Sequence, residues 1–252
     1  MIDFLGIGAQ KAGTTWLFER LSELPQVHFP AGKEVHFWDN YPSSDRDVSW
    51  WLNLFPDEPA GRKQGEITPA YALLDLPMIR KLKEHLPNLL VFYSVRNPIA
   101  RAWSHAMMSL SIGRLAGIPY SQALVEDFLK SDGVTRRGDY VTAITIWRKL
   151  FPQLHIIVFD DIVSQPAAVL AGLCRYLGID PPAAPDARLA VRAFAGQQRD
   201  VPDQLLDLLR RQYRPVIERM SELIGRDVSH WLEWNGRRSS SIMASAGFRE
   251  IN

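Results

Sequence analysis

The sequence contains only one cysteine, Cys174, among its 252 residues. A single cysteine excludes an intramolecular disulfide and a cysteine-rich zinc site, and it suits a reducing compartment. In its apolar surroundings, LAGLCRYLG, a buried core thiol is much more common than a nucleophile. The six histidines suggest no ligand cluster either, so we expect no metal.

Long apolar runs are also missing. The stretch LLVFYSV falls well short of the roughly 20 residues that a membrane helix needs, so we expect no membrane span. The N-terminus lacks a basic region, and its apolar run is broken at once by the glycines of GIGAQKAG, which argues against a signal peptide. These features predict a cytoplasmic location.

An excess of charge of one sign is absent, because 29 Lys and Arg face 28 Asp and Glu, for a net charge of +1. We therefore expect no nucleic-acid partner, and any anion site must be local. With 46% hydrophobic and 23% charged residues, the composition is that of an ordinary globular protein. We expect a single domain over residues 1–235 and a flexible tail over residues 236–252.

The apolar pattern alternates between short buried strands and amphipathic helices. Such alternation predicts an α/β fold, a three-layer α/β/α arrangement with a central parallel sheet of the P-loop nucleotide-binding type. The segment 25–59 reads as irregular and rich in aromatics. Strands are expected at 2–7, 65–68, 89–95 and 155–159, and helices at 14–24, 76–85, 98–110, 123–130, 140–150, 167–177 and 202–224.

The first strand is followed by a glycine loop, Gly8 to Gly13, and then by a helix. A helix N-terminus reached through glycines is an anion site, because free N–H groups and the helix dipole both point at the ligand. The spacing matches a nucleotide-binding loop, but Thr14 stands where such a loop carries lysine, and the lysine is Lys11 instead. Asp160 could associate with magnesium, although we favour Asp160 or Asp161 as the cap of the next helix.

Two blocks resemble the sulfotransferases that use 3′-phosphoadenosine 5′-phosphosulfate (PAPS). GAQKAGTTWL, residues 8–17, resembles their 5′-phosphosulfate loop, and SVRNPIARAWSH, residues 94–105, resembles their 3′-phosphate segment. A third block, KEVHFWD at residues 33–39, is most similar to the heparan sulfate N- and 3-O-sulfotransferase branch. The resemblance implies a bacterial cytoplasmic member of this family.

The resemblance also implies roles for particular residues. Lys11 would stabilise the leaving phosphate oxygen, Glu34 would be the catalytic base, and His36 could share or replace that role. The donor PAPS and its product PAP (3′-phosphoadenosine 5′-phosphate) would be held without a metal. The residues implied for nucleotide binding are Lys11, Ala12, Gly13, Thr14, Thr15, Trp16, Arg96, Ser104, Phe194, Gln198 and Arg199.

The sequence departs from the family pattern at several positions. Ile67 stands where the block GEITPAYALL usually has lysine, and Gln197 and Gln198 replace the lysine and glycine that usually precede Arg199. The disulfide of the heparan sulfate branch is missing, since Cys174 stands alone. Two alternatives therefore stay open: a P-loop kinase or NTPase, and an inactive PAP-binding relative.

The acceptor is expected to be a glycan or a small hydroxylated metabolite, sulfated on a hydroxyl or an amine. Four aromatic residues could stack on a sugar or aryl acceptor, although at least half of them are expected to be core. Arg136 and Arg137 could meet an anionic acceptor, but a solvated surface pair is the default for such residues. The four aromatics are Trp38, Tyr41, Trp50 and Trp51.

Overall fold

The computed structural model describes residues 1–43, 45–57, 61–112, 115–182 and 199–237. The chain divides into two compact units. The first unit holds Met1–Val95 and Tyr140–Pro185, and the second holds Arg96–Asp139 and Asp186–Asn252. The single domain over residues 1–235 and the flexible tail stay predictions.

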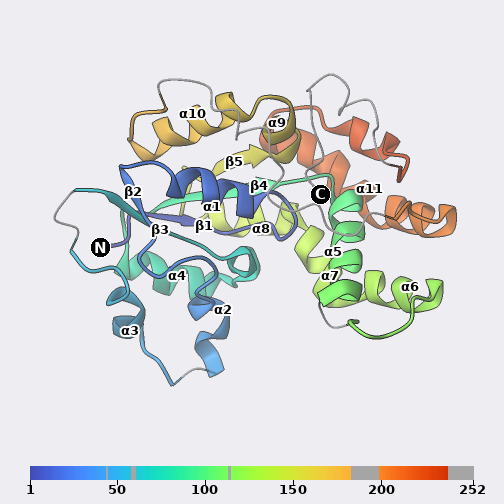
Figure 1. Ribbon diagram of the computed structural model, residues 1–252, viewed down its shortest axis with the longest axis horizontal. Coiled ribbons are helices and arrows are strands. Elements are labelled where there is room, and N and C mark those ends of the chain that lie inside the picture. Colours follow the sequence, from blue (N-terminus) through green and yellow to red (C-terminus); the bar gives the residue numbers. More distant parts are fainter. Residues whose placement is uncertain (44, 58–60, 113–114, 183–198, 238–252) are drawn as a thin grey trace. The chain divides into compact units, whose positions relative to one another are not determined.

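The first unit is built on a five-stranded parallel sheet with the order β2-β3-β1-β4-β5 (Figure 1). Its parallel register confirms the α/β fold with a central parallel sheet. The short strand β2 was not expected from the sequence, because two residues carry too little pattern to reveal a strand. The strands are β1 (Phe4–Gly6), β2 (Val27–His28), β3 (Lys63–Ile67), β4 (Leu90–Val95) and β5 (His155–Val158).

Four helices cover the two faces of this sheet: α1 (Thr14–Ser22), α4 (Leu76–His85), α8 (Tyr140–Arg148) and α10 (Pro166–Leu177). From β1 the chain moves toward β3, and from β3 it crosses back to β4. Right-handed crossovers in opposite directions place α1 and α4 on opposite faces. In agreement, α1 contacts α10, and α4 contacts α8 (Figure 1). The unit therefore has the three expected layers.

The segment 25–59 is less irregular than the sequence predicts. It contains the short helices α2 (Phe37–Asn40) and α3 (Val48–Leu52) and the 3₁₀ turn η1 (Tyr41–Ser43). Helix α3 has a clear start, because the Asp47 side chain accepts a hydrogen bond of 2.8 Å from the Trp50 amide. The helix is only one turn long, too short for a periodic pattern to be read from the sequence.

A further short helix, α9 (Phe159–Ser164), begins directly after β5. This helix was not expected from the sequence. The N-cap of α9 is Val158, and that of the following helix, α10, is Gln165. The prediction that Asp160 or Asp161 caps the next helix is therefore wrong. Both carboxylates lie instead in the first turn of α9, where they face the positive end of the helix dipole.

The core of the first unit lies on both faces of the sheet. Phe4, Leu5 and Phe92 on the central strands are fully buried, as is Trp147 on α8. Cys174 on α10 is also fully buried, and burial raises the pKa of its thiol to about 11. The thiol is therefore protonated at neutral pH, and the interpretation of Cys174 as a core residue is confirmed.

The second unit consists of helices and 3₁₀ turns in the residues that the structure describes. The long helix α11 packs against α5 and η5. Arg101 on α5 is fully buried and donates to the Val134 carbonyl at 2.8 Å, which ties α5 to α7. The elements are α5 (Pro98–Ile112), α6 (Gln122–Lys130), α7 (Asp132–Thr135), η3 (Arg136–Gly138), α11 (Asp203–Ile224) and η5 (Ser229–Glu233).

None of the helices in the described residues is both long enough and apolar enough to cross a membrane.

Candidate active site

The carboxyl ends of β1, β3 and β4 lie at the same edge of the parallel sheet, and β1 stands between the other two. The chain leaves β1 toward β3 and leaves β4 toward β5, so the connections diverge at this point. Such a switch point is where open α/β sheets bind their ligands. The glycine loop after β1 and the turn η2 (Pro69–Leu73) after β3 both begin there.

The loop Gly8–Gly13 is held by main-chain hydrogen bonds. The Ala9 amide donates to the Ser94 carbonyl at 2.6 Å, and the Ser94 amide donates to the Gly8 carbonyl at 2.7 Å. The Ser94 hydroxyl, at the end of β4, donates to the carbonyl of Ala12. Because most of these bonds use the backbone, the conformation of the loop depends little on the identity of its side chains.

Gly13 closes the loop as the N-cap of α1, with no side chain to cap the helix. Its φ of +88° is left-handed, and an added Cβ would lie 3.0 Å from carbon atoms of Phe159 and Ile162. Glycine thus allows the loop to pack against α9 while the first turn of α1 directs its amides outward. The loop and the helix N-terminus form the expected frame of an anion site.

The side chains around this frame differ in exposure. Ala12, Thr14 and Trp16 are buried, whereas Lys11 and Thr15 are partly exposed. Lys11 has a left-handed φ of +68°. Such a conformation is uncommon for a non-glycine residue and is most often found where the surrounding structure imposes it.

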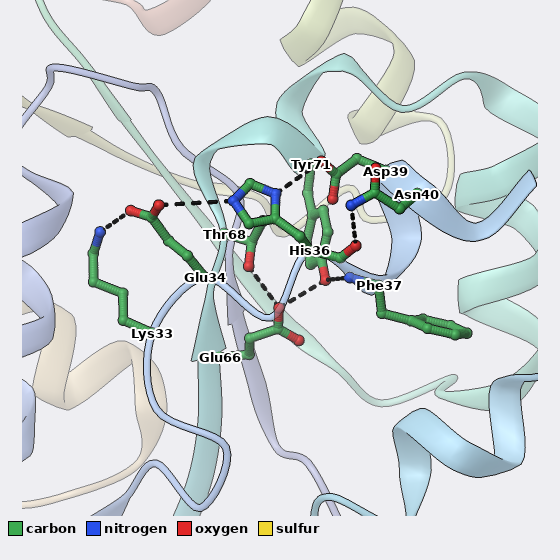
Figure 2. Close-up of polar contacts among 9 residues, drawn as sticks. All are labelled: Lys33, Glu34, His36, Phe37, Asp39, Asn40, Glu66, Thr68 and Tyr71. Carbon is green, nitrogen blue, oxygen red and sulfur yellow. Dashed lines mark hydrogen bonds and ion pairs between the residues drawn. The ribbon is translucent and has the colours of Figure 1, made fainter. Parts of the chain in front are cut away.

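The side chains of the segment Lys33–Asp39 form a chain of polar contacts (Figure 2). The Lys33 ammonium contacts the Glu34 carboxylate, and the other oxygen of that carboxylate lies 3.7 Å from His36 Nε2. His36 Nδ1 lies 2.8 Å from Asp39 Oδ2. The side chains of Glu34 and His36 are 42% and 41% exposed, so both remain accessible to a ligand.

This arrangement defines what the two predicted bases can do. In a neutral His36, the hydrogen bond to Asp39 keeps the proton on Nδ1 and leaves the lone pair on Nε2. That lone pair and the Glu34 carboxylate lie side by side, and each can accept a proton. The structure thus brings Glu34 and His36 together, and the choice between them as the base stays a prediction.

The backbone of this segment is unusual, because both Glu34 (φ +63°) and His36 (φ +57°) are left-handed without being glycine. The Glu34 amide donates to the Ile67 carbonyl at 3.0 Å, which anchors the segment to the end of β3. The Asn40 side chain donates to the His36 carbonyl at 2.9 Å. These hydrogen bonds hold the backbone on both sides of the strained residues.

A buried carboxylate lies beneath this segment that the sequence analysis did not single out. Glu66 on β3 is fully buried and accepts hydrogen bonds from the Trp51 indole (2.8 Å), the Thr68 hydroxyl (2.6 Å) and the Tyr71 hydroxyl (2.7 Å). Burial raises the pKa of Glu66 although all three hydrogen bonds lower it. The only sequence signal was a carboxylate within an expected strand, and its donors come from three separate elements of the chain: α3, the end of β3 and η2.

Position 67 carries isoleucine where the family pattern has lysine. Ile67 is fully buried, and a Cβ added to Gly6 on β1 would lie 2.9 Å from its side chain. Successive side chains of a strand point to opposite faces, so Ile67 and Glu66 face different sides of β3. Ile67 is therefore a core residue between β3 and β1.

The second unit carries the predicted 3′-phosphate residues. Arg96 follows the last residue of β4 in the sequence, and the neighbouring Asn97 is buried and donates to the Trp231 carbonyl at 2.8 Å. The Trp103 indole donates to the Arg199 carbonyl at 2.8 Å, so Arg199 lies against α5. Ser104, the next residue of α5, is partly exposed. Phe194 and Gln198 lie outside the described residues.

The aromatic group of the first unit divides into two halves. Trp38 and Trp51 are fully buried, which confirms that half of the group is core. Tyr41 and Trp50 are partly exposed, and each is covered by a cation. The Lys81 ammonium lies 4.1 Å from the Tyr41 ring centre, and the Arg46 guanidinium lies 3.9 Å from that of Trp50.

Arg136 and Arg137 have partners within the second unit. Arg136 is exposed and lies 3.7 Å from Asp132, and Arg137 donates to the Gly133 carbonyl. These contacts are typical of surface arginines. In the described part of the chain, no three His, Cys, Asp or Glu side chains are grouped so that they could hold a metal ion.

Comparison with known proteins identifies one family and several similar structures. Residues 2–191 match the model of the sulfotransferase domain family. The mouse and human heparan sulfate glucosamine 3-O-sulfotransferase 5 are 27% and 26% identical over 187 residues, which is 69% of this chain and 53% of theirs. The chain thus spans about half the length of these curated relatives.

Solved structures of the same class have similar folds. A sulfotransferase from Alicyclobacillus acidocaldarius superposes with a TM-score of 0.74 at 22% identity, covering 92% of this chain and 98% of that one. The mouse sulfotransferase SULT7A1, solved in complex with PAP, has a TM-score of 0.52 at 21% identity, covering 75% of this chain and 63% of that one. At these identities the similarity shows the fold.

Proposed function

Because the chain belongs to the sulfotransferase domain family, a family of PAPS-dependent enzymes, we propose that it transfers the sulfuryl group of PAPS to a hydroxyl or amine of a glycan or a small hydroxylated metabolite. The observation that carries the proposal is the loop Gly8–Gly13, whose backbone hydrogen bonds fix a helix N-terminus beside Lys11. A site of this kind favours the doubly negative 5′-phosphosulfate of PAPS.

The donor would be held at two places. The amides and hydroxyls of Thr14 and Thr15, together with Gly13, would bind the 5′-phosphate, with Ala12 and Trp16 shaping the turn. In the second unit, Arg96 and Ser104 would bind the 3′-phosphate through a guanidinium fork and a hydroxyl. The proposal also keeps Phe194, Gln198 and Arg199 as nucleotide-binding residues.

The reaction needs no covalent intermediate with the protein. The acceptor oxygen or nitrogen attacks sulfur, a new bond to sulfur forms, and the bond between sulfur and the 5′-phosphate oxygen of PAPS breaks in line with it. The electron pair of that bond leaves with PAP, and Lys11 stabilises the charge that grows on the leaving oxygen. Like phosphoryl transfer, this step depends mainly on positioning and electrostatics.

The acceptor must lose a proton during the attack. Glu34 would take it, and His36 is the alternative, because its Nε2 lone pair lies 3.7 Å from the Glu34 carboxylate. The exposure of both side chains supports access by an acceptor. A general base of this kind contributes about 10²- to 10⁴-fold to the rate.

The proposed donor is tested by calorimetric titration of the protein with PAP, 5′-AMP and ATP. We expect PAP to bind at least about tenfold more tightly than 5′-AMP, because the 3′-phosphate adds charge-assisted hydrogen bonds. Arg96→Ala should remove this preference. Arg136→Ala, an exposed arginine of the same unit with its own acidic partner, should leave it unchanged.

The outcomes separate the alternatives. Absence of any preference for the 3′-phosphate in the wild-type protein contradicts the proposal, and tight ATP binding instead supports the kinase alternative. Selective PAP binding without turnover on any acceptor supports the inactive PAP-binding alternative.

A further inference from the structure

The hydroxyl of Tyr71 has a fixed hydrogen-bonding direction. It lies 3.0 Å from the Phe37 amide and 3.4 Å from the Trp38 amide, and an amide can only donate. The hydroxyl must therefore accept there and donate its own proton elsewhere. Glu66 supplies the acceptor, with one carboxylate oxygen 2.7 Å away (Figure 2).

Glu66 itself cannot take part in the transfer. Its side chain is fully buried, and its two oxygens already accept three hydrogen bonds from Trp51, Thr68 and Tyr71. A fully enclosed carboxylate cannot reach an acceptor. Its effect on the reaction must pass through the groups that it orients.

Glu66 and Tyr71 together hold the turn that carries the two predicted bases, Glu34 and His36. Phe37 directly follows His36, which has a left-handed backbone, and two residues earlier Glu34 is left-handed as well. The Glu34 amide is fixed by the Ile67 carbonyl, and the Phe37 amide is fixed by Tyr71. Loss of either anchor allows the two strained residues to relax, which would move both side chains.

From this geometry we propose that Glu66 and Tyr71 are positioning residues for sulfuryl transfer. The Glu66 carboxylate orients the Tyr71 hydroxyl, and that hydroxyl holds the Phe37 amide so that the turn presents Glu34 and His36 to the acceptor. The inference rests on the proposed function, since it assigns the pair to the step in which the acceptor loses its proton.

The test compares Tyr71→Phe, Glu66→Gln and the double variant with the wild-type protein. Tyr71→Phe removes only the hydroxyl, and Glu66→Gln replaces one accepting oxygen by a donor. Tyr140→Phe is the matched control, because Tyr140 is a fully buried tyrosine of the same unit on a different element. The readouts are PAP release from PAPS with glucosamine, galactose, phenol or water as acceptor, the KM for PAPS, and PAP affinity by calorimetry.

We expect Tyr71→Phe and Glu66→Gln each to lower kcat per PAP-binding site by about 10- to 100-fold, because small displacements of a reacting group cost this much. The KM for PAPS and the PAP affinity should change less than about twofold, since the loop Gly8–Gly13 does not use this pair. The double variant should be no slower than the slower single variant, because both residues act through one hydrogen bond. Tyr140→Phe should keep the wild-type kcat.

The inference is overturned if Tyr71→Phe keeps more than half of the wild-type kcat, if the losses multiply in the double variant, or if the loss falls on PAP affinity. If Glu66→Gln does not fold, Tyr71→Phe decides, because phenylalanine keeps the shape of the buried ring.

A second readout does not depend on turnover. The ring ¹⁵N signals of His36 report its hydrogen bond to Asp39, and they should change in Tyr71→Phe but not in Tyr140→Phe. If the wild-type protein transfers no sulfuryl group, the proposed function fails, while the His36 signals still decide whether the pair positions the turn. Unchanged His36 signals in Tyr71→Phe overturn the inference.

Discussion

The loop Gly8–Gly13 and the turn Glu34–Asp39 both belong to the first unit, yet they are built in different ways. The loop is fixed by its own glycines and by backbone hydrogen bonds to the end of β4. The turn is fixed by one backbone hydrogen bond to Ile67 and by the hydroxyl of Tyr71, which donates to the buried carboxylate of Glu66. The loop thus depends mainly on backbone groups, whereas the turn also depends on the side chains of residues about thirty positions away in the sequence.

This difference suggests that the loop and the turn respond differently to substitutions. A loop held mainly by backbone hydrogen bonds can keep its shape while the side chains around it vary. A turn supported by side chains, in contrast, can be moved by substitutions beneath it. Substitutions in the two regions should therefore affect different kinetic constants.

The largest expected effect is on a residue of the turn, Glu34, and it should leave the loop Gly8–Gly13 unaffected. Glu34→Gln should lower kcat by about 10²- to 10⁴-fold, because the substitution removes the proposed general base. PAP affinity should stay within about twofold of the wild-type value, since Glu34 lies outside the loop Gly8–Gly13. Steady-state kinetics and calorimetry measure both quantities. Full turnover in Glu34→Gln would remove Glu34 as the base and leave His36.

The support of the turn can be tested through the two neighbouring tryptophans. Trp51→Ala should lower the free energy of unfolding by about 3–5 kcal/mol, because it empties a fully buried site and removes a donor to Glu66. Trp50→Ala should cost at most about 1 kcal/mol, the contribution of one exposed cation–π contact. Urea unfolding measures both decreases in the free energy of unfolding. Equal decreases would contradict the assignment of Trp51 to the buried residues that hold Glu66.

The loop can be tested at its closing glycine. Gly13→Ala should destabilise the protein by about 1–2 kcal/mol because of the left-handed backbone, with an added cost from the contacts at 3.0 Å. Gly32→Ala is the control, since Gly32 has a similar φ of +70° with nothing within 4 Å of the added Cβ. Only Gly13→Ala should weaken PAP binding, by about tenfold if one charge-assisted hydrogen bond is lost. Wild-type PAP affinity in Gly13→Ala would show that the loop tolerates a side chain, and an equal loss in Gly32→Ala would show that the effect is not specific to the loop.

The smallest expected effect is a dependence of stability on pH. Burial raises the pKa of Glu66 above its usual value of 4.5, so between 4.5 and the raised pKa the folded protein holds a proton that the unfolded chain has lost. Stability therefore falls as pH rises through this range, by at most about 1.4 kcal/mol per pH unit. Urea unfolding of the wild type and of Glu66→Gln at several pH values measures this dependence, and it should be absent in Glu66→Gln. The same slope in both proteins would assign it to other groups.

Much of the fold follows from the sequence, because long periodic segments determine it. Helix α4 spans Leu76–His85, the expected bounds, and the parallel sheet follows from the alternation of strands and helices. The strand β2 and the one-turn helices α2 and α3 were missed because elements of two to five residues carry no measurable period. Helix α9 was missed because its six residues follow β5 directly, and its two aspartates were interpreted as a cap of the next helix.

The candidate site divides in the same way. The loop around Lys11 and the pairing of Glu34 with His36 lie within contiguous motifs, so the sequence points to them. Glu66 was missed because its importance lies in its partners, and a sequence does not reveal that Trp51 and Tyr71 converge on one carboxylate. A carboxylate within an expected strand was the signal that could have identified it.

The central claim is tested most directly by incubating the protein with PAPS and a panel of hydroxylated compounds and amino sugars, and following the products by mass spectrometry. The account predicts that PAP forms together with an acceptor that has gained one sulfuryl group, and that both products fall together in Lys11→Ala. Phosphoryl transfer from ATP to the same acceptors, with no PAP released from PAPS, would contradict it.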